Sequence, residues 1–494
     1  MIRSLRMALL RSLASVLTLS ICDAAGAQDS AAPELPLRPF VHCVETLPGS
    51  KLRAHWGYFN RTKTSLQRAL GADNRVTGQA EGEPPTEFQP GFVMQAFNSV
   101  FDAGATSTWS IGGVSATADK RSHACSPAER TASSAELLNP APGSAMFLGA
   151  NFWSLHWQPM AEYFLPQANF AAEKPAPWQP SFLDELTPYR VLRFMDWNLT
   201  NDAQNPQSHW TTRQSAGQAQ GDAVAYEWQI DLCNRTGKDY WLTVPHAATP
   251  EYFAQLALLV SEKLDPRLRV YVEWSNEVWN GSFPQSSYAR AKGAQLRLPG
   301  KDPAMSYQVQ QSVRLFEAFA RVFGEKNPRV VKVLAGQAAW DGPCRAQLAA
   351  LQDPAINPKR TRADVYAIAP YVYGSSIADL RGNGMTQAKD WVREQLVCAQ
   401  SAGLPLIAYE GGQDSFELGQ QGCERVQRDP GMRALYASMP EVLAAAGLRG
   451  PFVHYTHSGI CWGLKVRNGD SNEASPKYQG LLDWLQKTKS AKSR

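Results

Sequence analysis

The sequence lacks the marks of several protein classes. Charged residues make up only 19% of the 494 residues, and the formal net charge is +4, so nothing indicates a nucleic acid or another polyanion as partner. Heptads, low-complexity tracts and internal repeats are missing, which argues against coiled coils and repeat arrays. The cysteines show no C-x-x-C or His-rich spacing, so we expect no zinc site, no other metal and no cofactor.

The one long apolar run lies at the N-terminus. Two arginines precede it, it ends at Ile21, and A-G-A at 25–27 fits a cleavage site, so we expect residues 1–27 to be a signal peptide. A membrane span is disfavoured because the run is short and contains Arg11. A lipoprotein box at Cys22 is a weaker alternative, because the large Ile21 precedes it. We therefore expect a secreted or periplasmic protein, whose formal charge falls to about +2 once three arginines and one aspartate leave.

The seven cysteines that follow residue 27 are widely spaced. An oxidising compartment favours disulfides between them. Cys43 and Cys125 bracket the first stretch of β pattern, whereas the other partners are not readable from the sequence. Because seven is odd, one cysteine stays free or pairs between chains.

Residues 38–126 read as a small all-β sandwich domain, rich in aromatic and β-branched residues. Gly112 and Gly113 separate two short apolar runs and predict a two-residue hairpin turn, in which both positions need positive φ. Residues 127–144, rich in serine and proline, have the composition of a linker.

From residue 145 to about 488 the pattern changes to short apolar runs that alternate with helical stretches. This rhythm is typical of repeated βα units, and eight such strands predict an α/β fold, a (β/α)8 TIM barrel. Residues 198–226, polar and rich in Gln, Asn and Gly, read as a long loop over the barrel mouth. The strands are expected near 145–152, 191–195, 239–244, 270–274, 330–335, 366–369, 406–409 and 452–455.

Two of these strands end in a glutamate. Glu277 follows the fourth strand and Glu410 the seventh, and the carboxyl ends of barrel strands form the catalytic mouth. Hydrolysis of a glycoside with retention needs two carboxyl groups about 5–5.5 Å apart, one protonated and one ionised. A strand-end glutamate is more often solvated or ion-paired, but the pair together favours catalysis. Glu273, deeper in its strand, is expected to be the buried partner of a cation.

The segments E-W-S-N-E at 273–277 and Y-E-G-G at 409–412 resemble clan A glycoside hydrolases, and more closely bacterial barrel proteins often labelled cellulose-binding or hydrolase-like. The resemblance covers roughly residues 146–485. It implies that Glu277 is the acid/base and Glu410 the nucleophile. It also implies that Asn276 binds the 2-hydroxyl of the sugar.

The same resemblance suggests roles for four residues near other strand ends. Arg193 would hold the nucleophile ionised, His246 would line the sugar site, and Trp462 would lie under the sugar ring. Tyr371 would touch the nucleophile, although A-P-Y replaces the expected His-x-Tyr pattern and Tyr373 lies close enough to compete.

Trp279 and Trp197 also follow strands, where a flat ring can stack on a pyranose. Tryptophans are more often core residues, so only some of these are expected to bind sugar.

The hypothesis is a retaining glycoside hydrolase that acts on a β-linked polysaccharide or oligosaccharide without a metal. The alternative is a barrel that binds polysaccharide and does not cut it. The sequence leaves the sugar, the linkage, endo or exo action and the oligomeric state open.

Overall fold

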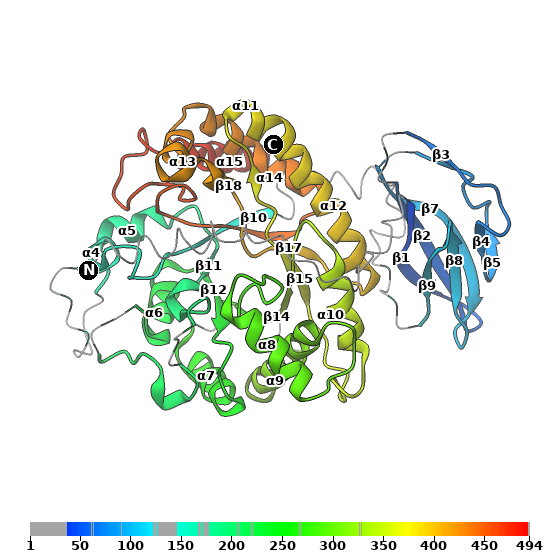
Figure 1. The fold of residues 1–494 in the computed structure, drawn as a ribbon, viewed down its shortest axis with the longest axis horizontal. Helices are drawn as coiled ribbons and strands as arrows, with labels where there is room; N and C mark the ends of the chain where they lie inside the picture. The colour runs from blue at the N-terminus through cyan, green and yellow to red at the C-terminus, as the bar shows by residue number, and fades with distance from the viewer. Residues whose placement is uncertain are drawn as a thin grey trace, which may run out of the picture. The chain divides into compact units, whose positions relative to one another are not determined.

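The computed structural model describes residues 37–492, except 126–145, 171–176 and gaps of one or two residues at 61, 63, 90, 121, 123–124, 166–167, 169, 204, 206, 219, 221, 266–267, 326 and 328. The expected signal peptide and the expected linker lie outside the described residues. The described residues form an N-terminal β region and a barrel (Figure 1).

The N-terminal region is antiparallel throughout. Its four-stranded sheet has the order β1-β2-β7-β5, its three-stranded sheet the order β4-β8-β9, and β3 pairs with β6. The bounds are β1 (Leu37–Leu47), β2 (Lys51–Asn60), β3 (Leu66–Gln67), β4 (Asn74–Val76), β5 (Gln79–Glu81), β6 (Glu87–Phe88), β7 (Gly91–Asp102), β8 (Ser107–Ile111) and β9 (Val114–Ala118).

Aromatic side chains from both sheets fill the core of this region. The ring of Trp56 on β2 lies 6.2 Å from that of Trp109 on β8, and Phe97 on β7 contacts both rings. The predicted hairpin turn is confirmed: Gly112 and Gly113 have φ of 54° and 83° and join β8 to β9. The expected all-β region is therefore present, and its core is aromatic.

The barrel is the predicted one. Eight parallel strands close in sequence order, which confirms the (β/α)8 fold. They are β10 (Met146–Asn151), β11 (Val191–Arg193), β12 (Asp239–Val244), β13 (Val270–Trp274), β14 (Val330–Ala335), β15 (Val365–Ile368), β17 (Leu406–Ala408) and β19 (Gly450–His454). Two short strands, β16 (Val372–Tyr373) and β18 (Gln413–Asp414), pair with each other beyond the ends of β15 and β17.

Helices surround the barrel (Figure 1). The longer ones are α6 (Tyr226–Thr236), α7 (Pro250–Lys263), α8 (Pro284–Gln295), α9 (Pro303–Phe323), α10 (Gly342–Gln352), α12 (Met385–Ser401), α13 (Gly419–Gln427), α14 (Gly431–Ala446) and α15 (Pro476–Lys492). The short ones are α4 (Met160–Tyr163), α5 (Pro180–Glu185) and α11 (Ile377–Asp379). Among the described residues, none of the helices combines the length and apolar character needed to cross a bilayer.

Helix α9 illustrates why these segments are helical. The carboxylate of Asp302 accepts the backbone N–H of Ala304 at 2.9 Å and so caps the first turn. Val309, Val313 and Phe316 follow at helical spacing and are buried, which places one apolar face against the barrel.

Three disulfides join Cys43 to Cys125, Cys344 to Cys398 and Cys423 to Cys461. The expectation of disulfides is therefore confirmed. Among the described cysteines, the odd one is Cys233, whose thiol is buried and free. Burial raises the pKa of this thiol well above its ordinary value, so it is an inert core residue.

Candidate active site

The loop after β13 carries Glu277 at the carboxyl end of the barrel. Alternation along β13 places Tyr271 and Glu273 on the inner side of the barrel, and both are buried. The chain then turns sharply, with positive φ at Ser275 (59°) and Glu277 (41°). Non-glycine residues adopt this conformation at a cost, which the surrounding contacts must offset. The turn is thus a strained segment at a strand end that holds one of the two expected carboxyl groups.

Arg193, at the end of β11, organises the centre of the site. Its side chain is fully buried and all five of its N–H groups have acceptors. Two donate to Glu273 at 3.0 and 3.1 Å, and one donates to Glu410 at 2.7 Å. The remaining two donate to Asn276 at 2.8 Å and Asn151 at 3.4 Å. Glu273 is thus the cation partner expected from the sequence.

Glu410 follows β17 and is buried beside that cation. Its second oxygen, Oε2, accepts the hydroxyl of Tyr371 at 3.0 Å. Burial raises the pKa of Glu410, while the charge of Arg193 and the hydrogen bond from Tyr371 act in the opposite direction. Tyr373, the competing residue, has a side chain that is 45% exposed, so Tyr371 is the tyrosine that touches Glu410.

Glu277 has neutral partners only. Tyr409 donates its hydroxyl to Oε1 at 3.1 Å, and the amide of Asn280 donates to Oε2 at 3.0 Å. Burial and the negative charge of Glu410 raise the pKa of Glu277 to about 7. The two carboxyl groups therefore differ in their environment: a cation favours the ionised form of Glu410, whereas Glu277 keeps its proton near neutrality.

Asp196, just after β11, is a third acid in this centre. All the N–H donors of Arg193 bond to other residues, and Asp196 accepts the hydroxyl of Tyr455 at 3.2 Å. Burial and the charge of Glu410 raise the pKa of Asp196 to about 7. A neutral Asp196 can donate a hydrogen bond to a ligand hydroxyl.

Asn276 and His246 both lie near the site, in different surroundings. Asn276 is buried, accepts from Arg193, and donates from its amide to Asn201 at 3.2 Å. The ring of His246 lies 5.0 Å from that of Tyr288. Burial lowers the pKa of His246, so it is neutral at pH 7 and can accept or donate a hydrogen bond.

The three expected tryptophans differ in their accessibility. Trp462 is partly exposed and stacks on Phe416 with ring centroids 5.1 Å apart. Trp279 is also partly exposed. Trp197, in contrast, has no exposed surface, and its indole N–H donates to the carbonyl of Trp153 at 2.8 Å. A ring enclosed on both faces cannot stack on a sugar, so Trp197 is corrected to a core residue.

Sequence reasoning missed the donors that hold Glu277. Tyr409 stands directly before Glu410, and Asn280 lies three residues after Glu277. Period-two alternation in the strand gives the only signal for Tyr409, because it places that side chain inside the barrel. Asn151, at the end of β10, was also missed.

A cluster with the ligand types of a metal site occurs once among the described residues, at Cys43, His55 and Cys125 in the N-terminal region. Two of its three members are joined in a disulfide, so their sulfurs are not thiolate ligands. The carboxyl groups at the barrel mouth are bound by arginine, tyrosine and asparagine instead.

Comparison with known proteins gives a resemblance in fold alone. No protein-family profile and no curated protein matches the sequence. Similar solved structures include a 4-O-α-L-rhamnosyl-β-D-glucuronidase from Fusarium oxysporum, with 13% identity, a TM-score of 0.40, and coverage of 69% of this chain and 68% of that chain.

Two further similar structures carry the names of a mannosidase and a mannanase. An exo-β-1,4-mannosidase from an Opitutaceae bacterium has 14% identity and a TM-score of 0.39, over 70% of this chain and 60% of that chain. An endo-1,4-β-D-mannanase from Thermotoga petrophila has 12% identity and a TM-score of 0.38, over 68% of this chain and 99% of that chain. At such low values these similarities carry no argument about chemistry, which must come from the side chains.

Proposed function

We propose that the protein is a retaining glycoside hydrolase that acts on a β-linked polysaccharide or oligosaccharide. The observation that carries the proposal is that two carboxyl groups at one barrel mouth have different partners, a cation for one and only neutral donors for the other. Arg193 and Tyr371 bond to Glu410 at 2.7 and 3.0 Å, whereas Glu277 has neutral donors and a pKa of about 7. Retaining hydrolysis requires this division between an ionised nucleophile and a protonated acid.

The reaction then proceeds in two displacements. Glu277 gives its proton to the glycosidic oxygen while a carboxylate oxygen of Glu410 bonds to the anomeric carbon, and the leaving sugar departs with that proton. In the second step Glu277 takes a proton from water, whose oxygen attacks the anomeric carbon and frees Glu410. Arg193 stabilises the Glu410 carboxylate before the first step and after the second.

The substrate contacts are proposals of the same kind. Asn276, which directly precedes Glu277 in the chain and accepts a hydrogen bond from Arg193, is assigned to the sugar 2-hydroxyl. His246 and Trp279 are assigned to the rim of the sugar site, and Trp462 to the face of a sugar ring.

We also propose export of the mature chain, because the three disulfides suit an oxidising compartment. The chain is further proposed to divide into a β domain at 38–126 and a catalytic barrel at 145–488.

Release of reducing ends from a panel of β-linked glycans tests the proposal. Glu410→Gln and Glu277→Gln are each expected to lower kcat on oligosaccharides by roughly 10³-fold or more. Glu325→Gln is the matched control, because Glu325 is exposed in the loop before β14, at the opposite end of the barrel. Near-wild-type activity in either active-site variant would refute the assignment.

Aryl glycosides distinguish the two roles. A dinitrophenyl leaving group needs no proton, so Glu277→Gln should retain far more activity on it than on an oligosaccharide, and added azide should accelerate the second step. Glu410→Gln should fail on both substrates. If wild type retains glycans on an affinity gel yet cuts none, the barrel is a binding protein and the proposed hydrolase is wrong.

A further inference from the structure

Four aromatic rings form a continuous surface on one side of the barrel mouth, here called the aromatic lane: Phe416, Trp462, Trp153 and Trp157. Trp462 stacks on Phe416 with centroids 5.1 Å apart and an interplanar angle of 20°. The ring centroid of Trp153 lies 6.5 Å from that of Trp462 and 6.5 Å from that of Trp157, both in edge contacts. Phe416 is 45% and Trp157 55% exposed. Large apolar rings left accessible at adjacent positions indicate a binding surface.

The lane is continuous with the candidate active site. The ring of Tyr455 lies 6.2 Å from that of Trp462, and its hydroxyl donates to Asp196 at 3.2 Å. The charge of Glu410 acts on Asp196. A ligand that reaches Glu410 can therefore extend directly onto the aromatic lane.

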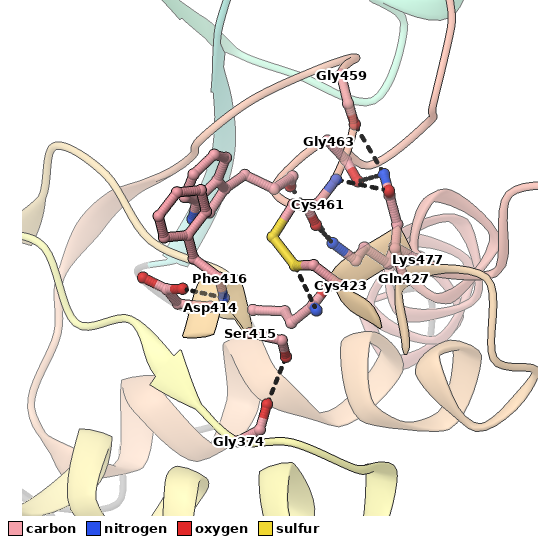
Figure 2. Close-up of a disulfide and its surroundings, with 12 residues drawn as sticks. Gly374, Asp414, Ser415, Phe416, Cys423, Gln427, Gly459, Cys461, Gly463 and Lys477 are labelled. Atoms are coloured by element: carbon pink, nitrogen blue, oxygen red, sulfur yellow. Dashed lines mark hydrogen bonds between the residues drawn. A yellow bond between two sulfur atoms is a disulfide. The ribbon is translucent and has the colours of Figure 1, made fainter. Parts of the chain in front are cut away.

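Buried polar side chains hold the loop that carries Trp462 in place (Figure 2). The side-chain amide of Gln427 donates to the carbonyls of Gly459 and Gly463, both at 2.8 Å, and its oxygen accepts the N–H of Cys461 at 2.8 Å. The fully buried amine of Lys477 donates to the carbonyl of Cys461 at 2.7 Å. Because the disulfide also anchors Cys461, this loop is ordered before any ligand binds, which reduces the entropy lost on binding.

Gly459 and Phe416 complete the preformed surface. A Cβ at Gly459 would lie 3.2 Å from the indole of Trp153, and φ there is +141°, so only glycine lets the ring pack against this loop. The backbone N–H of Phe416 donates to Asp414 at 3.0 Å (Figure 2). A hydrogen bond from Trp462 also acts on Asp414. The same carboxyl group thus bonds to both residues of the stacked pair, to the backbone of Phe416 and to the side chain of Trp462.

We propose that the aromatic lane binds the glycone part of a β-linked pyranose chain over more than one sugar ring, an inference that rests on the proposed function. The lane loops follow β17, β19 and β10, and β19 lies opposite β13 in the closed eight-strand order. Glu277 follows β13 and protonates the leaving group, so the leaving sugar lies on the β13 side. The sugars that stay attached to the anomeric carbon extend the other way, onto the lane.

A pyranose chain fits this surface better than a peptide does. The axial C–H groups of a β-linked pyranose form a flat apolar face, which packs on the negative face of an aromatic ring. Around it lie groups that bond to hydroxyls, among them Asp414 and the half-exposed His156, whose ring lies 4.9 Å from that of Trp157.

Binding is measured by titration calorimetry in the Glu410→Gln background, so that hydrolysis does not interfere. The probes are disaccharides and hexasaccharides of β-1,4-linked glucose, mannose and xylose. Trp157→Ala and Phe416→Ala are expected to weaken binding of the best hexasaccharide by about tenfold or more and to leave the disaccharide within about twofold. Leu258→Ala is the control, because Leu258 is equally exposed, at 43%, but lies on helix α7.

A second measurement fixes the direction of the chain. With a hexasaccharide labelled at its reducing end, the active protein should release short labelled fragments, and Trp157→Ala should move cleavage so that longer labelled fragments appear.

The outcomes separate the two proposals. The proposed glycan-binding role of the aromatic lane is overturned if both lane variants keep the hexasaccharide affinity of the parent protein. It is also overturned if the parent protein binds none of the probes. Lane-dependent binding without any cleavage by the wild type supports the lane as a glycan site and refutes the proposed hydrolase. If Trp157→Ala does not change the cleavage pattern, the proposed glycan-binding role of the lane is refuted, whereas the proposed hydrolase activity is supported.

Discussion

In the proposed mechanism, the alkaline limb of the pH–rate profile depends on Glu277, the group that must be protonated in the first displacement. Its pKa is raised to about 7, first by burial and then by the charge of Glu410. Since the reactive form is the neutral acid, activity is lost as pH rises through this pKa, by about tenfold per pH unit above it. An ordinary glutamate would instead place the loss near its reference pKa of about 4.3.

The hydroxyl of Tyr409 offers a way to move that limb. It donates to Glu277 at 3.1 Å, and this hydrogen bond lowers the pKa of Glu277 by stabilising the carboxylate. A hydrogen bond of this kind contributes about 0.5–1.5 kcal/mol, which corresponds to roughly 0.4–1.1 pKa units. In Tyr409→Phe the donor is gone, so the pKa rises and the alkaline limb shifts to higher pH by that amount.

The assay is kcat/KM against pH for hydrolysis of an unactivated oligosaccharide, with wild type and Tyr409→Phe compared. Phenylalanine keeps the ring that packs on Arg193, whose guanidinium lies 4.9 Å from it. Tyr252→Phe is the matched control, because that buried hydroxyl donates to Tyr226, away from the site. A limb that is absent near pH 7, or that moves to lower pH in Tyr409→Phe, would refute the reasoning.

Three further outcomes are expected. Arg193→Met leaves two buried carboxylates without their cation and should lower the free energy of unfolding by about 3–5 kcal/mol, measured by denaturant titration; an unchanged midpoint would contradict the buried ion-pair role. Tyr371→Phe should lower kcat by about tenfold with the melting temperature retained, whereas Tyr373→Phe should leave kcat unchanged. Equal effects of the two changes on kcat would contradict a role for the hydroxyl that bonds to Glu410, the proposed nucleophile. Replacing both Cys423 and Cys461 with serine removes a cross-link between residues 38 positions apart. By chain entropy this should lower the free energy of unfolding by about 4 kcal/mol, and the less ordered loop should raise KM for long glycans. An unaltered KM would contradict a contribution of loop order to glycan binding.

The barrel was predictable because its strands are buried on both faces. Parallel strands covered by helices become continuous apolar runs, and each of the eight predicted runs overlaps an observed strand. The hairpin at Gly112 and Gly113 was predictable for a local reason as well, since two adjacent positions of positive φ favour glycine. The positions of Glu277 and Glu410 were predictable because each glutamate comes shortly after a buried apolar run.

The sequence by itself thus determined which segments become strands, and that two glutamates come at the carboxyl ends of the fourth and seventh, because both properties depend on neighbours along the chain. Only the tertiary structure decided which groups meet across the barrel. Arg193 bonds to acids from two other strands, Trp197 is enclosed while Trp462 stays accessible, and the cysteine pairs join different elements. These outcomes depend on the closure of the barrel and the packing of its loops, which bring together residues that are up to hundreds of positions apart, and no local pattern records such contacts.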